Sequence, residues 1–198
     1  QNSVTEHKLN AQLYSAVLEW DYEGYTVKSL TSYQVDDILV RRDNDRNDLA
    51  YLPPFALLPS EYDPETNKQT TFTQEINLVS SEPAFGKLDW IAGLFYLDTE
   101  IEISILERLD FGFDGVFDPF TIDDIYAYSG DVGFITDSKP ERDSTSLYGQ
   151  GTWNHSDALR TVFGLRYTRD EVYSAVTNFY GRSGTDILET SGNKITGR

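Results

Sequence analysis

The chain has 198 residues, with 16 lysines and arginines against 33 aspartates and glutamates, and its formal net charge is −17. This balance excludes a nucleic-acid partner, because no basic surface is available to neutralise phosphates. The sequence contains no cysteine, which excludes a disulfide framework, a thiol nucleophile and a cysteine-based metal site. No run of about 20 apolar residues occurs, so no transmembrane helix is predicted.

Helical periodicity is nearly absent, and the sequence predicts an all-β chain of six strands. The expected strands cover residues 8–20, 25–36, 69–80, 88–106, 144–154 and 158–173. Short turns at 21–24, 81–87 and 154–157 alternate with long loops at 37–68, 107–143 and 174–198. This alternation is typical of the antiparallel up-and-down meander of an outer-membrane barrel, whereas a soluble sandwich mixes its loop lengths.

Residues 95–105 show the clearest strand pattern, because apolar side chains recur at every second position except Thr99. Asp98, Glu100 and Glu102 occupy the intervening positions, so the strand has one apolar and one charged face. The same period returns at 159–168. We therefore expect Ile101 and Phe163 to face lipid and the carboxylates to face a water-filled lumen. A soluble sheet that is wetted on one side produces the same alternation.

Four large aromatic residues lie beside the expected short turns, at one end of their strands: Trp20, Tyr22, Trp90 and Trp153. A membrane barrel places a girdle of aromatic side chains at each interface with water, because such rings are apolar with a polar edge. The pattern predicts membrane-interface residues here. Ordinary core aromatics are the alternative.

Several segments resemble consecutive strands of a TonB-dependent outer-membrane receptor. They are Ser29–Gln34, Phe72–Ser80 (FTQEINLVS), Leu88–Tyr96 (LDWIAGLFY), Leu147–Trp153 and Leu159–Asp170. The resemblance covers about 25–170 and implies part of a large transmembrane β-barrel of about 22 strands, from the middle of that barrel. It also implies a bacterial outer-membrane location and uptake of a scarce large ligand such as a siderophore, cobalamin, haem or a glycan.

In this family the energy-coupling protein TonB drives uptake through parts that we do not find in this sequence, and no plug domain is recognisable. The chain begins at Gln1 without a methionine and ends in a polar segment, so we expect it to be a piece of a longer protein.

The candidate ligand-binding residues are charged side chains expected in the lumen or on the long loops. They are Arg42, Arg46, Asp98, Glu100, Glu102, Asp123, Asp124 and Arg166. Arginine can grip an anionic small molecule or metal chelate through paired hydrogen bonds. The acidic, aromatic-rich segment 107–143 suits ligand capture or Ca²⁺ coordination, although its aspartate spacing is not that of an EF-hand. A solvated surface loop is the alternative for each cluster.

No catalytic constellation is predicted. Glu100 and Glu102 share a strand face like the two acids of a glycosidase, but nothing separates their roles. His7 and His155 lie almost a chain length apart, and no Gly-x-Ser-x-Gly elbow occurs. We therefore expect no enzyme activity, no metal site and no cofactor. The competing interpretations are a soluble all-β binding or adhesion module, and a fragment that assembles into a β-rich filament.

Overall fold

The computed structural model of the chain describes residues 5–43, 60–109, 132–179 and 183–197. The described residues form seven β-strands and no helix. The strands are β1 (Glu6–Tyr22), β2 (Tyr25–Asp43), β3 (Ser60–Ser80), β4 (Leu88–Leu109), β5 (Val132–Ser156), β6 (Leu159–Phe179) and β7 (Ser183–Gly197). The expected all-β class is confirmed. No helix in the described ranges is long and apolar enough to cross a membrane.

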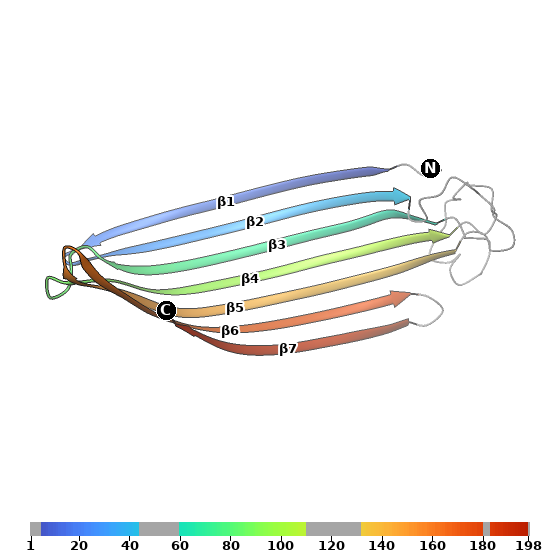
Figure 1. Cartoon of the computed structure of the whole chain (residues 1–198). Helices are drawn as coiled ribbons and strands as arrows, with labels where there is room; N and C mark the ends of the chain where they lie inside the picture. Colours follow the sequence, from blue (N-terminus) through green and yellow to red (C-terminus); the bar gives the residue numbers. More distant parts are fainter. Residues whose placement is uncertain (1–4, 44–59, 110–131, 180–182, 198) are drawn as a thin grey trace.

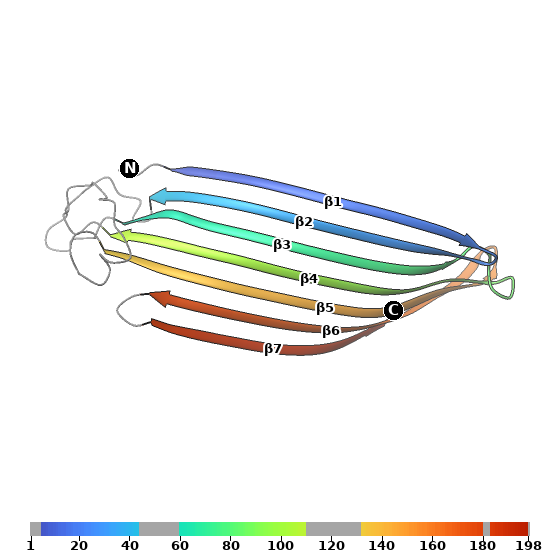
Figure 2. The same cartoon turned by 180° about the vertical axis from the view of Figure 1, so that it is seen from behind.

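All seven strands belong to one antiparallel sheet, in which spatial order follows chain order from β1 to β7 (Figure 1). Each strand pairs only with its immediate neighbours in the sheet. The views from front and back show a single curved layer with β1 and β7 at its edges (Figures 1 and 2). The predicted up-and-down meander is therefore confirmed, and the described residues contain no second sheet of the kind that a sandwich needs.

The predicted strand boundaries were wrong at the ends away from the short turns. β7 occupies most of 174–198, which was expected to be a loop, and 60–68 and 132–143 belong to strands. These stretches are mostly polar, and their few apolar residues do not alternate regularly, so they lack the pattern that identifies a half-buried strand. They pair through backbone hydrogen bonds, which do not depend on side-chain polarity.

The short turns form where expected. Tyr22 and Tyr25 are directly paired across a two-residue turn, and their rings stack with centroids 5.3 Å apart. Gly24 has a φ of 87°, a conformation that glycine adopts without a steric penalty. This turn fixes the register between β1 and β2, and hence the face on which each side chain lies.

The sheet has no hydrophobic core, although 39% of the chain is hydrophobic. The buried residues in the described ranges are all small or polar: Asn77, Gly93, Ser144, Ser146 and Gly151. Burial of apolar surface is the dominant favourable term in folding. The apolar side chains of this sheet therefore need another apolar phase or partner surface to cover them.

Candidate functional site

The strand register divides the side chains between two faces, because directly paired residues of neighbouring strands lie on the same face. Trp20, Trp90 and Trp153 share one face, called the tryptophan face. Arg166 lies on the other, called the Arg166 face. The Tyr22 side chain also lies on the tryptophan face. All four aromatic residues singled out in the sequence thus share one face and the short-turn end of the sheet.

Two rows of aromatic residues cross the tryptophan face. The turn-side rim contains Trp20, Tyr22, Tyr25, Trp90 and Trp153, and the far rim contains Tyr14, Tyr33, Phe72, Tyr96 and Tyr167. The rims are six residues apart on β4, from Trp90 to Tyr96, and eight apart on β2, from Tyr25 to Tyr33. At about 3.4 Å per residue this is roughly 20–27 Å along the strands.

An apolar belt fills the space between the rims. It contains Leu18, Val27, Ile76, Leu78, Ala92, Leu94, Leu147, Phe163 and Leu165. Leu94, Leu147 and Leu165 are 53%, 57% and 61% exposed, so the belt is open to its surroundings. A contiguous apolar surface of this kind marks contact with a membrane or another protein.

Polar residues interrupt the belt near β2 and β3, but they satisfy one another. The Thr31 hydroxyl donates to the Gln74 side-chain oxygen at 2.6 Å, and the Gln74 amide donates to the Ser29 hydroxyl at 3.0 Å. A polar group can lie in an apolar environment when it is hydrogen-bonded. These residues therefore do not break the apolar character of the belt.

The register corrects one expectation. Phe163 lies on the tryptophan face, whereas Ile101 lies on the Arg166 face, so one lipid layer cannot cover both. The apolar residues of β4 change from one face to the other along the strand. Near Leu94 they are even-numbered and lie on the tryptophan face, whereas near Ile101 they are odd-numbered and lie on the Arg166 face. Sequence periodicity read over a single window does not reveal such a change.

Asp98, Glu100 and Glu102 do not share a face with Arg166, although all four were expected to line one lumen. They lie on the tryptophan face, beyond the far rim, and on the opposite face from Arg166. The Tyr96 hydroxyl donates hydrogen bonds to Asp98 at 3.3 Å and to Asp143 at 3.0 Å. On the tryptophan face, these carboxylates therefore form an acidic region beyond the far rim, on the side away from the short turns.

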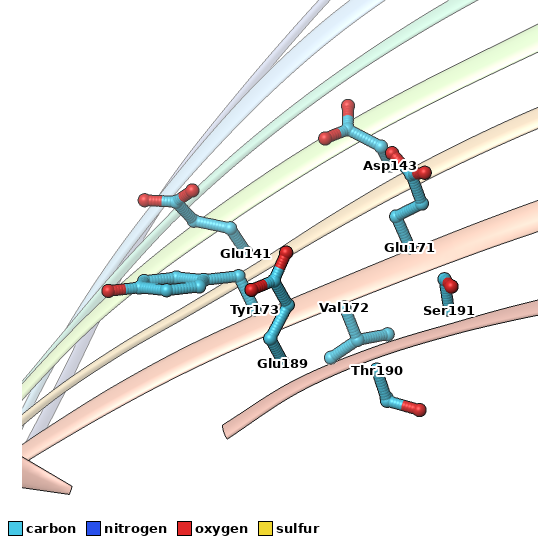
Figure 3. A pocket seen from close by; sticks show the side chains of 8 residues that line it. All are labelled: Glu141, Asp143, Glu171, Val172, Tyr173, Glu189, Thr190 and Ser191. Atoms are coloured by element: carbon cyan, nitrogen blue, oxygen red, sulfur yellow. The ribbon is translucent and has the colours of Figure 1, made fainter. Parts of the chain in front are cut away.

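A shallow groove of about 590 Å³ lies in this acidic region, between β5, β6 and β7. Figure 3 shows Glu141, Asp143, Glu171 and Glu189 projecting to the same side of the sheet as Tyr173. Within the described ranges no group of three or more acidic or histidine side chains is arranged to hold a metal ion. The groove is an acidic surface.

Arg166 is the centre of a polar cluster on the other face. Its guanidinium carbon lies 5.6 Å from the ring centroids of both Phe95 and Tyr148, a cation–π distance. One guanidinium NH₂ donates to the Ser146 hydroxyl at 2.9 Å, and Nε donates to Thr168 at 3.3 Å. These contacts hold a planar cation in one orientation on the Arg166 face.

Tyr148 extends the cluster across the sheet to β3, where its hydroxyl hydrogen-bonds Glu75 and Asn77. Its ring crosses β4 at Gly93: a Cβ on Gly93 would lie 2.5 Å from the Tyr148 ring carbon Cζ. Glycine is therefore required at position 93 because the Tyr148 ring packs directly against its Cα, and not because of its backbone conformation. Cross-strand contacts thus link four strands, from Glu75 on β3 to Arg166 on β6.

The remaining candidate residues are more scattered. Arg42 forms an ion pair with Glu65 at 3.1 Å, near one end of β2. Arg46, Asp123 and Asp124 lie outside the described residues. The sequence did not single out Tyr148, Glu75 or Phe95 as partners of Arg166, because the register that joins them depends on the pairing of four strands. From the sequence, only the odd or even position of each residue within its own strand was available to indicate its face.

Glu102 and Lys139 form an exposed ion pair at 2.9 Å. The hydrogen bond from Lys139 lowers the pKa of Glu102 below 4.5, and the same bond raises the pKa of Lys139 above 10.5. The pair therefore stabilises the fold between these limits. That contribution is lost as pH falls through the lowered pKa of Glu102, or rises through the raised pKa of Lys139. Both side chains are exposed, so the effect on stability is small.

We predict that Lys139→Ala returns the pKa of Glu102 toward 4.5, which titration by carboxyl-selective NMR would measure. Asp170 provides the control, because its pKa is lowered by hydrogen bonds from Ser144 and Arg142, on the opposite face of the sheet. An unchanged Glu102 titration would show that this ion pair does not form in solution.

Comparison with known proteins gives one kind of match. No protein-family model and no curated protein sequence matches the chain. Among solved structures, it is similar to the ferric yersiniabactin uptake receptor FyuA from Yersinia pestis, with a TM-score of 0.67 and 11% identity. The match covers 96% of this chain and 25% of that receptor, so the chain spans about a quarter of its length.

The likeness shows the fold. The seven-stranded sheet has the fold of part of a β-barrel wall. At 11% identity, the similarity does not identify a ligand or a partner for this chain.

Proposed function

We propose that this chain forms part of the wall of an outer-membrane β-barrel receptor of the TonB-dependent type. In this proposal lipid covers the apolar belt, and the Arg166 face lines a polar interior through which a large scarce ligand passes. The receptor would take up a siderophore, cobalamin, haem or glycan, with energy supplied by TonB through other parts of the protein.

The apolar belt with its two aromatic rims is the observation that carries the proposal. Outer-membrane barrels present an outward apolar band about 25 Å tall between two aromatic girdles, with a polar interior on the alternate side chains. The rims here are roughly 20–27 Å apart along the strands, at about 3.4 Å per residue, and a barrel tilt of about 35–45° makes this a band roughly 14–22 Å tall. The similar structure is also named as an uptake receptor.

The first test is membrane insertion of the protein that carries this chain. We expect it to fractionate with the bacterial outer membrane, to require detergent for extraction and to float with phosphatidylcholine vesicles after refolding. A species that remains monomeric in buffer without detergent would contradict the proposal and favour a soluble binding module. A detergent-independent particle of high mass would instead indicate a filament.

The second test is energy-coupled uptake. Cells producing the protein would be supplied with ferric siderophores, haem or cobalamin, each carrying a radiolabel, in the presence and absence of TonB. We expect accumulation of one of these ligands only where TonB is intact. Equal accumulation in both strains would contradict energy coupling while leaving the barrel assignment in place.

Arg166 gives a residue-level prediction for an anionic ligand. We expect Arg166→Gln to lower uptake about tenfold or more, because a hydrogen bond to a charged group contributes roughly 1.5–3 kcal/mol. Arg169→Gln is the matched control: Arg169 lies on the same strand, on the tryptophan face, paired with Glu171. Equal losses in both variants would rule out a specific role for Arg166.

A further inference from the structure

Two exposed cations on the Arg166 face, Arg166 and Lys194, have no carboxylate partner among the described residues. Four other arginines of the sheet each form an ion pair with an aspartate or glutamate: Arg41, Arg42, Arg142 and Arg169. The chain has a formal net charge of −17, so carboxylates are abundant. Two neighbouring cations that lack one therefore mark a place where an outside anion would be favoured.

The strand register brings these two cations together. Arg166 pairs directly with Thr196 across β6 and β7, and Thr168 pairs with Lys194. Because paired residues share a face, Lys194 and Thr196 project to the Arg166 face. Lys194 is thus a diagonal neighbour of Arg166, and diagonal neighbours on a sheet lie about 7–8 Å apart, within reach of long side chains.

The Arg166 guanidinium is held in place but keeps free donors. Its Nε donates to Thr168, its Nη2 donates to Ser146, and the Phe95 and Tyr148 rings lie beside its central carbon. Within the described residues, Nη1 donates no hydrogen bond. Arginine can therefore offer one N–H from each terminal nitrogen to an oxyanion, as in bidentate recognition of carboxylate or phosphate.

A hollow of about 250 Å³ lies beside Arg166, between β5, β6 and β7. Gln150, Arg166 and Thr196 contribute polar side chains to it from the Arg166 face. Gly164 leaves the hollow open, because a Cβ there would lie 3.3 Å from the Gly149 carbonyl oxygen and 3.5 Å from the Gln150 side chain. The missing side chain at position 164 thus leaves space for a small group next to the guanidinium.

Two carboxylates on the same face are engaged elsewhere. Asp170 forms an ion pair with Arg142 at 3.1 Å and accepts a hydrogen bond from Ser144. Glu75 accepts a hydrogen bond from the Tyr148 hydroxyl. These acids are satisfied by other groups, so an anion that enters the hollow would meet the positive charges of Arg166 and Lys194.

We propose that Arg166, Lys194 and Thr196 bind the phosphate group of a small phosphorylated solute. The site depends on the proposed function, because the Arg166 face must line a water-filled interior for such a solute to reach it. A phosphate monoester carries a charge of about −1.5 to −2 at pH 7 and three strong acceptor oxygens, which matches two cations and a hydroxyl. A monocarboxylate would compensate only one of the cations.

Broadening of the ³¹P resonance of inorganic phosphate tests the site, with the protein that carries this chain purified in detergent. We expect the resonance to broaden as the unaltered protein is added. Lys194→Gln should weaken binding about tenfold, because a hydrogen bond to a charged group contributes roughly that factor. Gly164→Val should weaken it several-fold by filling the hollow. Lys194 is exposed, so Lys194→Gln decides the matter even if Gly164→Val does not fold.

Two matched controls separate the site from general effects of charge and bulk. Lys68→Gln removes an exposed lysine on the opposite, tryptophan face. Gly192→Val adds the same side chain on the Arg166 face of β7, where a Cβ meets nothing within 4 Å. We expect both variants to bind inorganic phosphate as the unaltered protein does.

The phosphate site is overturned if the unaltered protein gives no broadening, or if Lys68→Gln weakens binding as much as Lys194→Gln. Either result leaves the barrel assignment in place when the same protein fractionates with the outer membrane and needs detergent for extraction. A protein that remains monomeric in buffer without detergent contradicts the proposed function, and the interior that the site requires is lost with it.

Discussion

Leu165→Arg is expected to destabilise the membrane-inserted protein by about 2 kcal/mol, because an arginine on the lipid face is most costly at the bilayer midplane and less costly toward the interfaces. Leu165 is 61% exposed, within the apolar belt, and two residues from Tyr167 on the far rim. Its leucine side chain packs against little protein, so the expected cost comes from placing a cation in hydrocarbon. Urea unfolding in vesicles, followed by tryptophan emission, would measure it.

Val162→Arg is the matched control. Val162 lies on the same strand, is 38% exposed, and projects to the Arg166 face. A charge there would enter the polar interior, and we expect a change within about 0.5 kcal/mol, as for ordinary surface substitutions. Equal destabilisation by the two variants would show that the two faces do not meet different solvents, and would remove the main support for a barrel wall.

Gly93→Ala is expected to cost about 1–3 kcal/mol, because it forces Tyr148 away and leaves polar groups without their hydrogen bonds. The new Cβ would lie 2.5 Å from both the Tyr148 Cζ and Oη atoms. Asn77 is only 7% exposed, so water could not easily replace the lost Tyr148 hydroxyl. The same unfolding assay would detect the loss, and Tyr148→Phe should reproduce part of it.

Gly149→Ala tests whether strand glycines are sensitive in general. Gly149 pairs with Ala92 on β4, and a Cβ there would lie 3.7 Å from the Ile91 carbonyl oxygen, an ordinary contact. Since alanine restricts the unfolded chain more than glycine does, we expect this variant to be stabilised by about 0.4–1 kcal/mol. A loss as large as that of Gly93→Ala would contradict the steric explanation for Gly93.

The sequence by itself determined the fold class, the antiparallel meander and the positions of the short turns. Alternation of side chains has a local cause, since it follows from the strand geometry of each segment, and Glu23–Gly24 encodes its own hairpin. The aromatic residues Trp20, Tyr22, Trp90 and Trp153 could be grouped for the same reason, because they lie beside turns.

Only the tertiary structure decided which face each residue occupies relative to distant strands. The face of a residue relative to a distant strand depends on the register of every strand pair between them. Arg166 on β6 and Glu75 on β3 both contact Tyr148 because three successive strand pairings place all three residues on one face. The same dependence separated Ile101 from Phe163. The assignment of β7 as a strand also required the tertiary structure. Its residues pair with β6 through backbone hydrogen bonds, which leave no hydrophobic pattern in the sequence.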